Sequence, residues 1–186
     1  PVHVLGRGAG IEVGCAWRLG QVLKRENVDV LHAHQYTPFF YGMMSRLFRH
    51  RTPILFTEHG RFHPDYPSHR RKAFNRCMIR RRDRFVGVGQ FVRQALIDNE
   101  GLSGRRVGVI YNGIDLNSFG GGRRDRQSVL DEFGLDDDDF VVIMVARLDY
   151  LKDHLTAVRT IEHLAKRLPK IRLLVVGEGP ERAKIE

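Results

Sequence analysis

The chain has 186 residues, with 31 Lys or Arg against 22 Asp or Glu, so its net charge is +9 when the nine histidines are neutral. With 42% apolar residues and only 7 prolines, the composition excludes disordered, collagen-like and coiled-coil proteins. The longest apolar run, residues 140–146, is far shorter than the roughly 20 residues that span a bilayer. Cys15 and Cys77 fit neither a disulfide framework nor a CxxC pair, which argues against structural zinc and agrees with a reducing compartment.

Short apolar runs alternate with segments of helical period along the chain. We expect strands at 2–5, 28–33, 54–57, 85–88, 107–111, 140–146 and 171–176. We expect helices at 13–24, 39–48, 70–82, 90–99, 127–133 and 155–168. This alternation predicts the α/β class, with parallel sheets covered by helices on both faces.

A glycine-rich polar stretch around residues 120–125 divides the series in two and is typical of a linker. We therefore predict one Rossmann-like domain over 1–115, a linker over 116–126 and the first part of a second domain over 127–186. The second part shows two clear strands, too few to bury a stable core alone. We expect the chain to be a fragment of a longer protein, with both domains incomplete.

Charge concentrates between residues 70 and 84, where eight basic residues and one acid give a net +7. Ala73, Phe74, Cys77 and Met78 recur at helical spacing, which predicts an amphipathic basic helix. Such a cluster suggests phosphate groups of a nucleic acid or an anionic membrane surface. The simpler interpretation is that the apolar stripe packs on a sheet. Phe74 is the only aromatic residue in the segment, which argues against nucleic acid.

Two motifs invite a ligand and are set aside. The glycines of residues 6–10 resemble a dinucleotide loop, but the third glycine of that pattern is replaced by Ile11, so we predict a plain turn. The four aspartates 136–139 contain Asp-x-Asp patterns of the kind that hold a divalent metal. They precede a strand, whereas ligands collect beyond the carboxyl ends of strands, so we predict a solvated turn and no metal.

The residues that follow the predicted strands are polar. His32 and His34 end one strand, and His59 follows the next. Arg147 and Lys152 follow a strand of the second domain, where a guanidinium fork and a compact ammonium suit a diphosphate. We interpret His32 as a core histidine and expect His34 and His59 to face a cleft, because functional groups concentrate on loops set by a rigid scaffold.

Five motifs together resemble the retaining family-four glycosyltransferases in order and spacing. They are VDVLHAH at 28–34, FTEHG at 56–60, VIYNGID at 109–115, VARLDYLKD at 145–153 and VVGEGP at 175–180. The resemblance implies a GT-B architecture of two Rossmann-like domains that face a cleft. It also implies that the first domain binds the acceptor and the second binds a nucleotide-sugar donor.

The resemblance assigns roles to single residues. Arg147 and Lys152 match the basic pair that holds the donor diphosphate, so neither a metal nor another cofactor is expected. His59 matches the histidine near the transferred sugar, and His34 is placed on the acceptor side with it. Gly177 and Gly179 match the loop that borders the nucleotide, and a tight turn is the alternative interpretation of both.

The implied reaction is attack of an acceptor hydroxyl on the anomeric carbon with retention of configuration, the leaving phosphate taking the proton. His59, Arg147 and Lys152 are the expected catalytic residues, and Gly113 is expected to be a hinge or a turn between the domains. The family's glycine-rich loop would precede Pro1, and its pair of glutamates would follow Glu186.

The implied partners are a nucleotide-sugar and a sugar or lipid-linked acceptor. The basic segment 70–84 fits a peripheral contact with an anionic membrane, so we expect a cytoplasmic protein that lies at the inner face of the membrane. Three other interpretations stay open: a nucleotide-sugar epimerase of the same fold, a nucleic-acid-binding module and a non-catalytic partner subunit.

Overall fold

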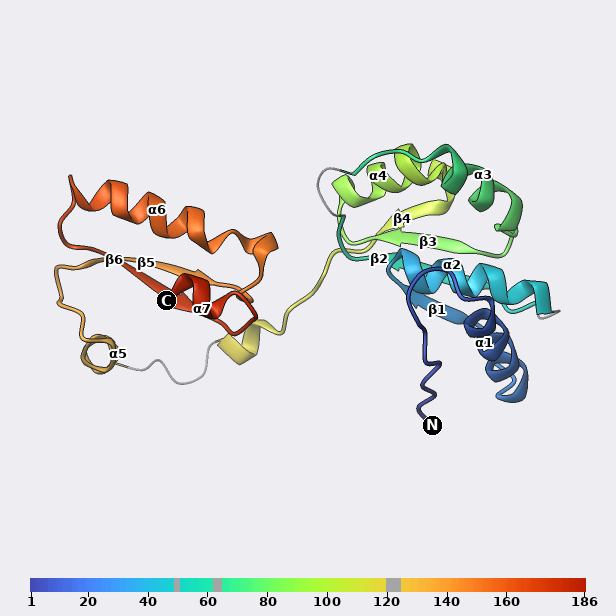
Figure 1. Ribbon diagram of the computed structural model, residues 1–186, viewed down its shortest axis with the longest axis horizontal. Coiled ribbons are helices and arrows are strands. Elements are labelled where there is room, and N and C mark those ends of the chain that lie inside the picture. Colours follow the sequence, from blue (N-terminus) through green and yellow to red (C-terminus); the bar gives the residue numbers. More distant parts are fainter. Residues whose placement is uncertain (49–50, 62–64, 120–124) are drawn as a thin grey trace. The chain divides into compact units, whose positions relative to one another are not determined.

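Two units of alternating strands and helices make up the protein, as a computed structural model shows (Figure 1). The structure describes residues 1–48, 51–61, 65–119 and 125–186. The first unit covers Pro1–Ile114 and the second covers Asp115–Glu186. All strand pairs in both units are parallel, which confirms the predicted α/β class.

The first unit contains a four-stranded sheet in the order β1-β2-β3-β4. Its elements are α1 (Val13–Arg25), β1 (Leu31–His34), α2 (Tyr36–Ser45), β2 (Ile54–Glu58), α3 (His69–Met78), β3 (Arg84–Gly87), α4 (Gln90–Glu100) and β4 (Val107–Val109). Short 3-10 turns at Arg46–Phe48 and Gly104–Arg106 complete it.

One row of side chains across this sheet forms the core. Ala33, Phe56, Phe85 and Val107 are aligned by the strand register and are all buried. Phe39 of α2 stacks on Phe56 with ring centroids 4.4 Å apart. Residues of α3 and α4 pack against the same cluster, so these helices lie against one face of the sheet.

The expectation of helices on both faces is wrong for the described part of this unit. The alternate row of the sheet contains His32, His34 and Arg84, which are exposed. Right-handed crossovers between strands added in one direction place every helix on the same face. The strand order β1-β2-β3-β4 therefore explains why this sheet has one covered and one open face.

A buried ion pair joins the amino ends of the central strands to the end of α2. Asp83, just before β3, accepts hydrogen bonds from Arg46 Nη1 at 2.9 Å and from the Ile54 backbone N–H at 2.9 Å. Burial acts to raise the pKa of Asp83, but the hydrogen bonds from Arg46, Arg80 and Ile54 outweigh it, so this pKa is lowered. The negative charge of Asp83 is thus compensated inside the fold and does not offset the exposed basic residues around it.

The second unit contains a two-stranded sheet of β5 (Phe140–Val145) and β6 (Ile171–Val176). Its helices are α5 (Arg126–Phe133), α6 (His154–Ala165) and α7 (Arg182–Ile185). Large apolar side chains of β5 stay accessible to solvent: Phe140 is 63% exposed, Ile143 58% and Val145 71%.

Several boundaries differ from the expectations. Residues 2–5 form no strand, and Leu5 packs against the cluster between α1 and α2. β1 begins at Leu31, three residues later than predicted. In the predicted linker 116–126, Leu116–Phe119 is a 3-10 turn and Arg126 begins α5, while 120–124 lie outside the described residues.

The predicted apolar stripe of α3 is also partly wrong. Ala73 and Cys77 are exposed, whereas Asn75 is fully buried. Among the described residues, no helix has both the length and the apolar character needed to cross a bilayer.

Candidate functional site

A pair of histidines lies at the carboxyl ends of the first two strands. His34 is the last residue of β1, and His59 directly follows β2. His34 Nδ1 and His59 Nε2 are 2.7 Å apart, so one ring nitrogen donates a hydrogen bond to the other. The structure thus brings together the two histidines predicted for the acceptor side, and both are exposed.

His32 belongs to the same group, and its interpretation as a core histidine is wrong. Its ring centroid lies 4.1 Å from that of His34 on the open face of the sheet, and Nε2 lies 2.9 Å from Thr57 Oγ1. Burial among these neighbours, followed by the charges of His34 and His59, lowers the pKa of His32. Three imidazoles therefore lie side by side at this edge.

The turn after His34 has an uncommon backbone conformation. Gln35 has a φ of 73°, in the region that side chains other than glycine rarely adopt. Its backbone N–H donates to Thr57 O at 2.9 Å, which fixes the turn against β2. Such conformations persist where the surrounding structure imposes them and occur often at functional sites.

A buried polar network holds the segment that carries His59. Arg61 donates to Asp65 at 2.8 Å and to Glu100 of α4 at 2.6 Å, and it lies 3.4 Å from Glu58. Burial raises the pKa of Glu58, whereas the hydrogen bond from Arg61 lowers that of Asp65. Asn75 extends the network by donating to Glu100 O at 3.0 Å.

Our sequence analysis missed this network. Glu58 and Arg61 flank His59 in the sequence, and charged residues beside a motif are a signal that could have been followed. Asn75 lies on α3 and Glu100 on α4, far from Arg61 in the sequence, so no local pattern pairs them with Arg61.

The predicted diphosphate pair lies on the segment that follows β5. The Arg147 side chain is 71% exposed, and its only ion-pair contact with a described residue is Asp149 at 3.9 Å. Lys152 ends a 3-10 turn that Asp149 opens by accepting a hydrogen bond from the Leu151 backbone N–H. Asp153 follows with a φ of 50° and caps α6. Both cations are therefore available to an external anion.

Gly177 and Gly179 lie against this segment, backbone to backbone. A Cβ on Gly177 would lie 2.0 Å from Ala146 O, and one on Gly179 would lie 2.2 Å from Leu148 O. Leu148 N–H donates to Glu178 O at 3.0 Å, which continues the strand pairing beyond the sheet. The structure thus brings the glycine loop and the Arg147 segment together and requires glycine at both positions.

The aspartate run lies in a turn before β5, at the amino edge of the sheet. Asp138 forms an ion pair with Lys170, and the hydrogen bond from Lys170 lowers the pKa of Asp138. Asp139 forms an ion pair with Arg172 at 3.2 Å. Nowhere among the residues described here do His, Cys, Asp and Glu side chains gather as a set that could hold a metal ion.

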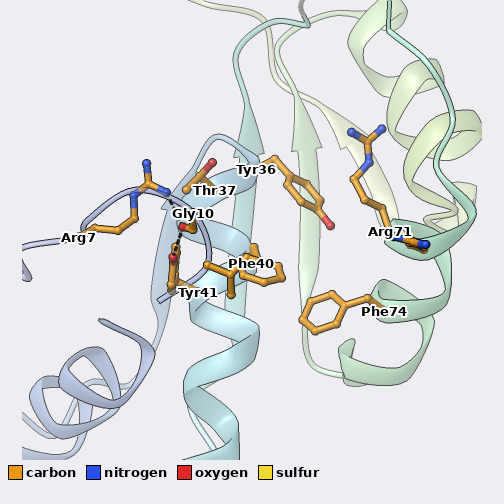
Figure 2. Close-up of a pocket in the computed structure, with 10 residues that line it drawn as sticks. Arg7, Gly10, Tyr36, Thr37, Phe40, Tyr41, Arg71 and Phe74 are labelled. Carbon is orange, nitrogen blue, oxygen red and sulfur yellow. Dashed lines mark hydrogen bonds between the residues drawn. The ribbon is translucent and has the colours of Figure 1, made fainter. Parts of the chain in front are cut away.

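A cavity of about 410 Å³ opens in the first unit beside the start of α2 (Figure 2). Aromatic side chains and arginines line it, among them Tyr36, Phe74 and Arg71. Our sequence analysis did not predict it, because its lining comes from three separate segments.

Solved structures share this fold. A glycosyltransferase from Rickettsia africae aligns with a TM-score of 0.66 and 16% identity, over 94% of this chain and 54% of that one. The Anabaena protein Alr3699/HepE, solved in complex with UDP, aligns with a TM-score of 0.69 and 20% identity, over 91% and 45%. These likenesses support the predicted GT-B fold.

Curated relatives are similar in sequence across most of the chain. The D-inositol 3-phosphate glycosyltransferase of Mycolicibacterium smegmatis is 28% identical over 89% of this chain. A phosphatidylinositol N-acetylglucosaminyltransferase subunit from Arabidopsis thaliana is 25% identical over 89%. The chain spans 40% and 35% of the lengths of these relatives.

Family models cover both units. The model of Glycosyl transferases group 1 matches residues 125–186, which contain Arg147, Lys152 and the glycine loop. The model of Glycosyltransferase Family 4 matches residues 1–118, which contain the histidine pair. The chain belongs to glycosyltransferase family 4.

Proposed function

We propose that the protein containing this chain transfers a sugar from a nucleotide-sugar to an acceptor hydroxyl with retention of configuration. The observation that carries the proposal is the Arg147 segment. It presents an exposed guanidinium, and the glycine loop fixes its backbone. A nucleoside diphosphate leaving group develops negative charge, which preorganised cations stabilise without reorganisation.

Arg147 and Lys152 have complementary roles in this proposal. The guanidinium fork binds two diphosphate oxygens at once, and the ammonium of Lys152 acts as a compact point charge. The leaving phosphate takes the proton of the attacking hydroxyl, so the chemistry demands positioning more than a protein base.

The histidine pair supports the acceptor side of the reaction. The hydrogen bond between His34 and His59 fixes the orientation of both rings. Each ring keeps a second nitrogen, and in the described part of the chain neither of these has a hydrogen-bond partner. We assign to His59 a hydrogen bond with a hydroxyl of the transferred sugar. We assign to His34 the role of holding the His59 ring in place.

We propose that no metal or other cofactor takes part. The aspartate run has the pattern for a metal, but Asp137, Asp138 and Asp139 form ion pairs with Arg126, Lys170 and Arg172. It also lies at the amino edge of β5, away from the carboxyl edge that carries Arg147.

The test compares Arg147→Ala with Arg167→Ala, an exposed arginine that follows α6. Turnover is measured as acceptor-dependent release of nucleotide, and the binding of UDP, ADP and GDP is measured by calorimetry. We expect turnover of Arg147→Ala to fall about 100-fold or more, as for loss of one transition-state charge partner. We expect Arg167→Ala to match the wild type. Equal kinetics for both variants, or no binding of UDP, ADP or GDP, would contradict the proposal.

The same assay separates the alternatives. A nucleotide-sugar epimerase converts its substrate without an acceptor, so acceptor dependence excludes it. The nucleic-acid module loses support because Phe74, the aromatic residue of the basic segment, faces Phe40 in the cavity with ring centroids 4.9 Å apart. Its ring is therefore already packed against another side chain.

We also propose that the protein is cytoplasmic and contacts an anionic membrane through arginines at the amino edge of the first sheet. Arg81, Arg84, Arg105 and Arg106 surround a hollow of about 520 Å³. Arg84 and Arg106 donate to backbone carbonyls of residues 80–83, so these interactions leave their charge uncompensated. Each basic residue near an anionic surface contributes roughly 1 kcal/mol to binding.

A further inference from the structure

The buried network beside His59 contains more acidic than basic side chains. Its charged members are three carboxyl groups and two guanidinium groups, those of Glu58, Asp65, Glu100, Arg61 and Arg71. If all of them were ionised, the described part of this network would carry a net charge of −1. Apart from Arg71, these side chains are at most 16% exposed, so water compensates little of that charge. A buried group without a compensating charge changes its protonation state instead.

The contacts show which carboxyl group is left over. Arg61 donates hydrogen bonds to both oxygens of Asp65, at 2.8 and 3.0 Å, and to Glu100 at 2.6 Å. Arg71 forms a second ion pair with Glu100 at 3.2 Å. Among the described side chains, the one cation that reaches Glu58 is Arg61, at 3.4 Å, and Glu58 Oε1 is buried without a hydrogen-bond partner. The two positive charges therefore compensate Asp65 and Glu100.

The surroundings of Glu58 oppose its ionisation. Burial raises the pKa of Glu58, and the neighbouring Glu100 acts in the same direction. Arg61 and the Gly60 backbone N–H act to lower this pKa but do not outweigh burial. Tyr36 borders the network, and burial raises its pKa to about 12, so its hydroxyl stays neutral. One proton on Glu58 makes the described network neutral.

His59 lies between the two residues that join this network to the edge of the sheet. Glu58 precedes it, and Arg61 follows it by two positions. The Glu58 carbonyl accepts a hydrogen bond from the backbone N–H of Val88 at 3.2 Å, and Arg61 is anchored on α4 through Glu100. The backbone is thus held on both sides of His59. A charge on Glu58 would draw Arg61 away from its other partners or draw in water, and either change moves His59.

We propose that Glu58 carries a proton where ordinary carboxyl groups are ionised, and that this neutral acid and Arg61 are positioning residues for His59. Both act through the backbone that carries His59 and not by contact with substrate. Loss of the proton leaves an uncompensated charge in the network and displaces His59 from the transferred sugar. This inference rests on the proposed function, because that function gives His59 its task.

Infrared spectroscopy of the wild-type chain tests for the proton. At pH 6, carboxyl groups with ordinary pKa values near 4 are ionised. We expect the C=O band of one protonated carboxyl group at this pH, and we expect Glu58→Gln to lack it. Asp98→Asn removes an exposed carboxyl group of α4 and is the matched control, which is expected to keep the band. A wild-type spectrum without the band would overturn the proposal, whether or not the variant folds.

The proton also predicts how stability changes with pH. The folded protein holds the Glu58 proton above the ordinary pKa of 4.5, whereas the unfolded chain releases it there. Stability is therefore lost as the pH rises from 4.5 towards the raised pKa of the folded state. Over that interval we expect the unfolding constant of the wild type, measured with urea, to rise about tenfold per pH unit relative to Glu58→Gln. A constant ratio between the two proteins would contradict the bound proton.

The His59 ring reports on positioning. In NMR spectra of the wild type, its signals are expected to shift twice with pH, once for its own titration and once with the midpoint at which the infrared band disappears. Glu58→Gln is expected to lack the second shift. The ring of His163, an exposed residue of the second unit, is the control and is expected to shift once. Loss of the band without a second His59 shift would overturn the positioning role.

Turnover separates this inference from the proposed function. In the wild type, kcat is expected to fall through the same midpoint while the KM for the nucleotide-sugar stays constant, because Arg147 and Lys152 belong to the other unit. Glu58→Gln is expected to keep its kcat there. The infrared band and both His59 shifts without acceptor-dependent turnover would contradict the proposed function alone. A 100-fold effect of Arg147→Ala without the band would contradict this inference alone.

Discussion

At the scale of single residues, Gly177 and Gly179 show how packing and function meet in one motif. The sequence motif left two interpretations open, a nucleotide-binding loop and a tight turn. The structure adds a third reason for glycine, the close approach of the segment that carries Arg147. Any side chain at Gly179 meets Leu148 O, a backbone atom that cannot rotate away.

We therefore expect Gly179→Ala to destabilise the second unit by roughly 1–3 kcal/mol, the range for atoms forced into packed structure. The measurement is amide hydrogen exchange of Leu148 and of the strands β5 and β6. Gly113→Ala is the control, because an added Cβ there has no atom within 4 Å. Unchanged exchange at Leu148 in Gly179→Ala would show that this close approach does not exist in solution.

The histidines illustrate what alternation in a strand can and cannot predict. It placed His32 opposite Ala33, as found, because side chains alternate between faces. It could not show which face is covered, so His32 was interpreted as a core residue. The pairing of His34 with His59 joins residues 25 positions apart and depends on the register of β1 against β2.

At the scale of elements, α3 divides the basic segment into two groups. The helix spans ten residues, roughly 15 Å at 1.5 Å per residue. Arg70 and Arg71 at its start lie on the aromatic cavity, and Arg81 and Arg84 beyond its end lie on the amino-edge hollow. One run of charge in the sequence is thus two surfaces in the structure.

This division predicts that the two groups of arginines act separately. The double variant Arg81→Gln/Arg105→Gln is expected to reduce co-sedimentation with phosphatidylglycerol vesicles by roughly tenfold or more, given about 1 kcal/mol per residue. Arg70→Gln is expected to retain vesicle binding. Vesicles of phosphatidylcholine alone are the control, and equal binding to both vesicle types would exclude a membrane contact that depends on anionic lipid.

The stripe of α3 was mispredicted because a polar residue occupies a buried position. Asn75 is satisfied by Tyr36, by the Glu100 carbonyl and by the Glu100 carboxylate. Periodicity counts only apolar residues, so it shifted the stripe toward Ala73 and Cys77. Most helix and strand positions were predicted correctly, because their apolar patterns reflect direct packing on the sheet.

At the scale of the whole molecule, both units contain parallel sheets. In the first unit, the described residues leave one face of the sheet uncovered. The α/β class could be predicted from the alternation of strands and helices. The open face could not, because it follows from the order in which the strands are joined.

The two units should differ in stability. The first buries two apolar clusters, whereas the second has a two-stranded sheet whose Phe140, Ile143 and Val145 stay exposed. Because free energy of folding scales with apolar area removed from water, we expect amides of β5 and β6 to exchange at least tenfold faster than those of β2 and β3. Hydrogen exchange with mass spectrometry measures both in one sample. Ile143→Thr, which removes exposed apolar surface, should leave the rates of β2 and β3 unchanged, and equal protection of the two sheets in the wild type would contradict the difference.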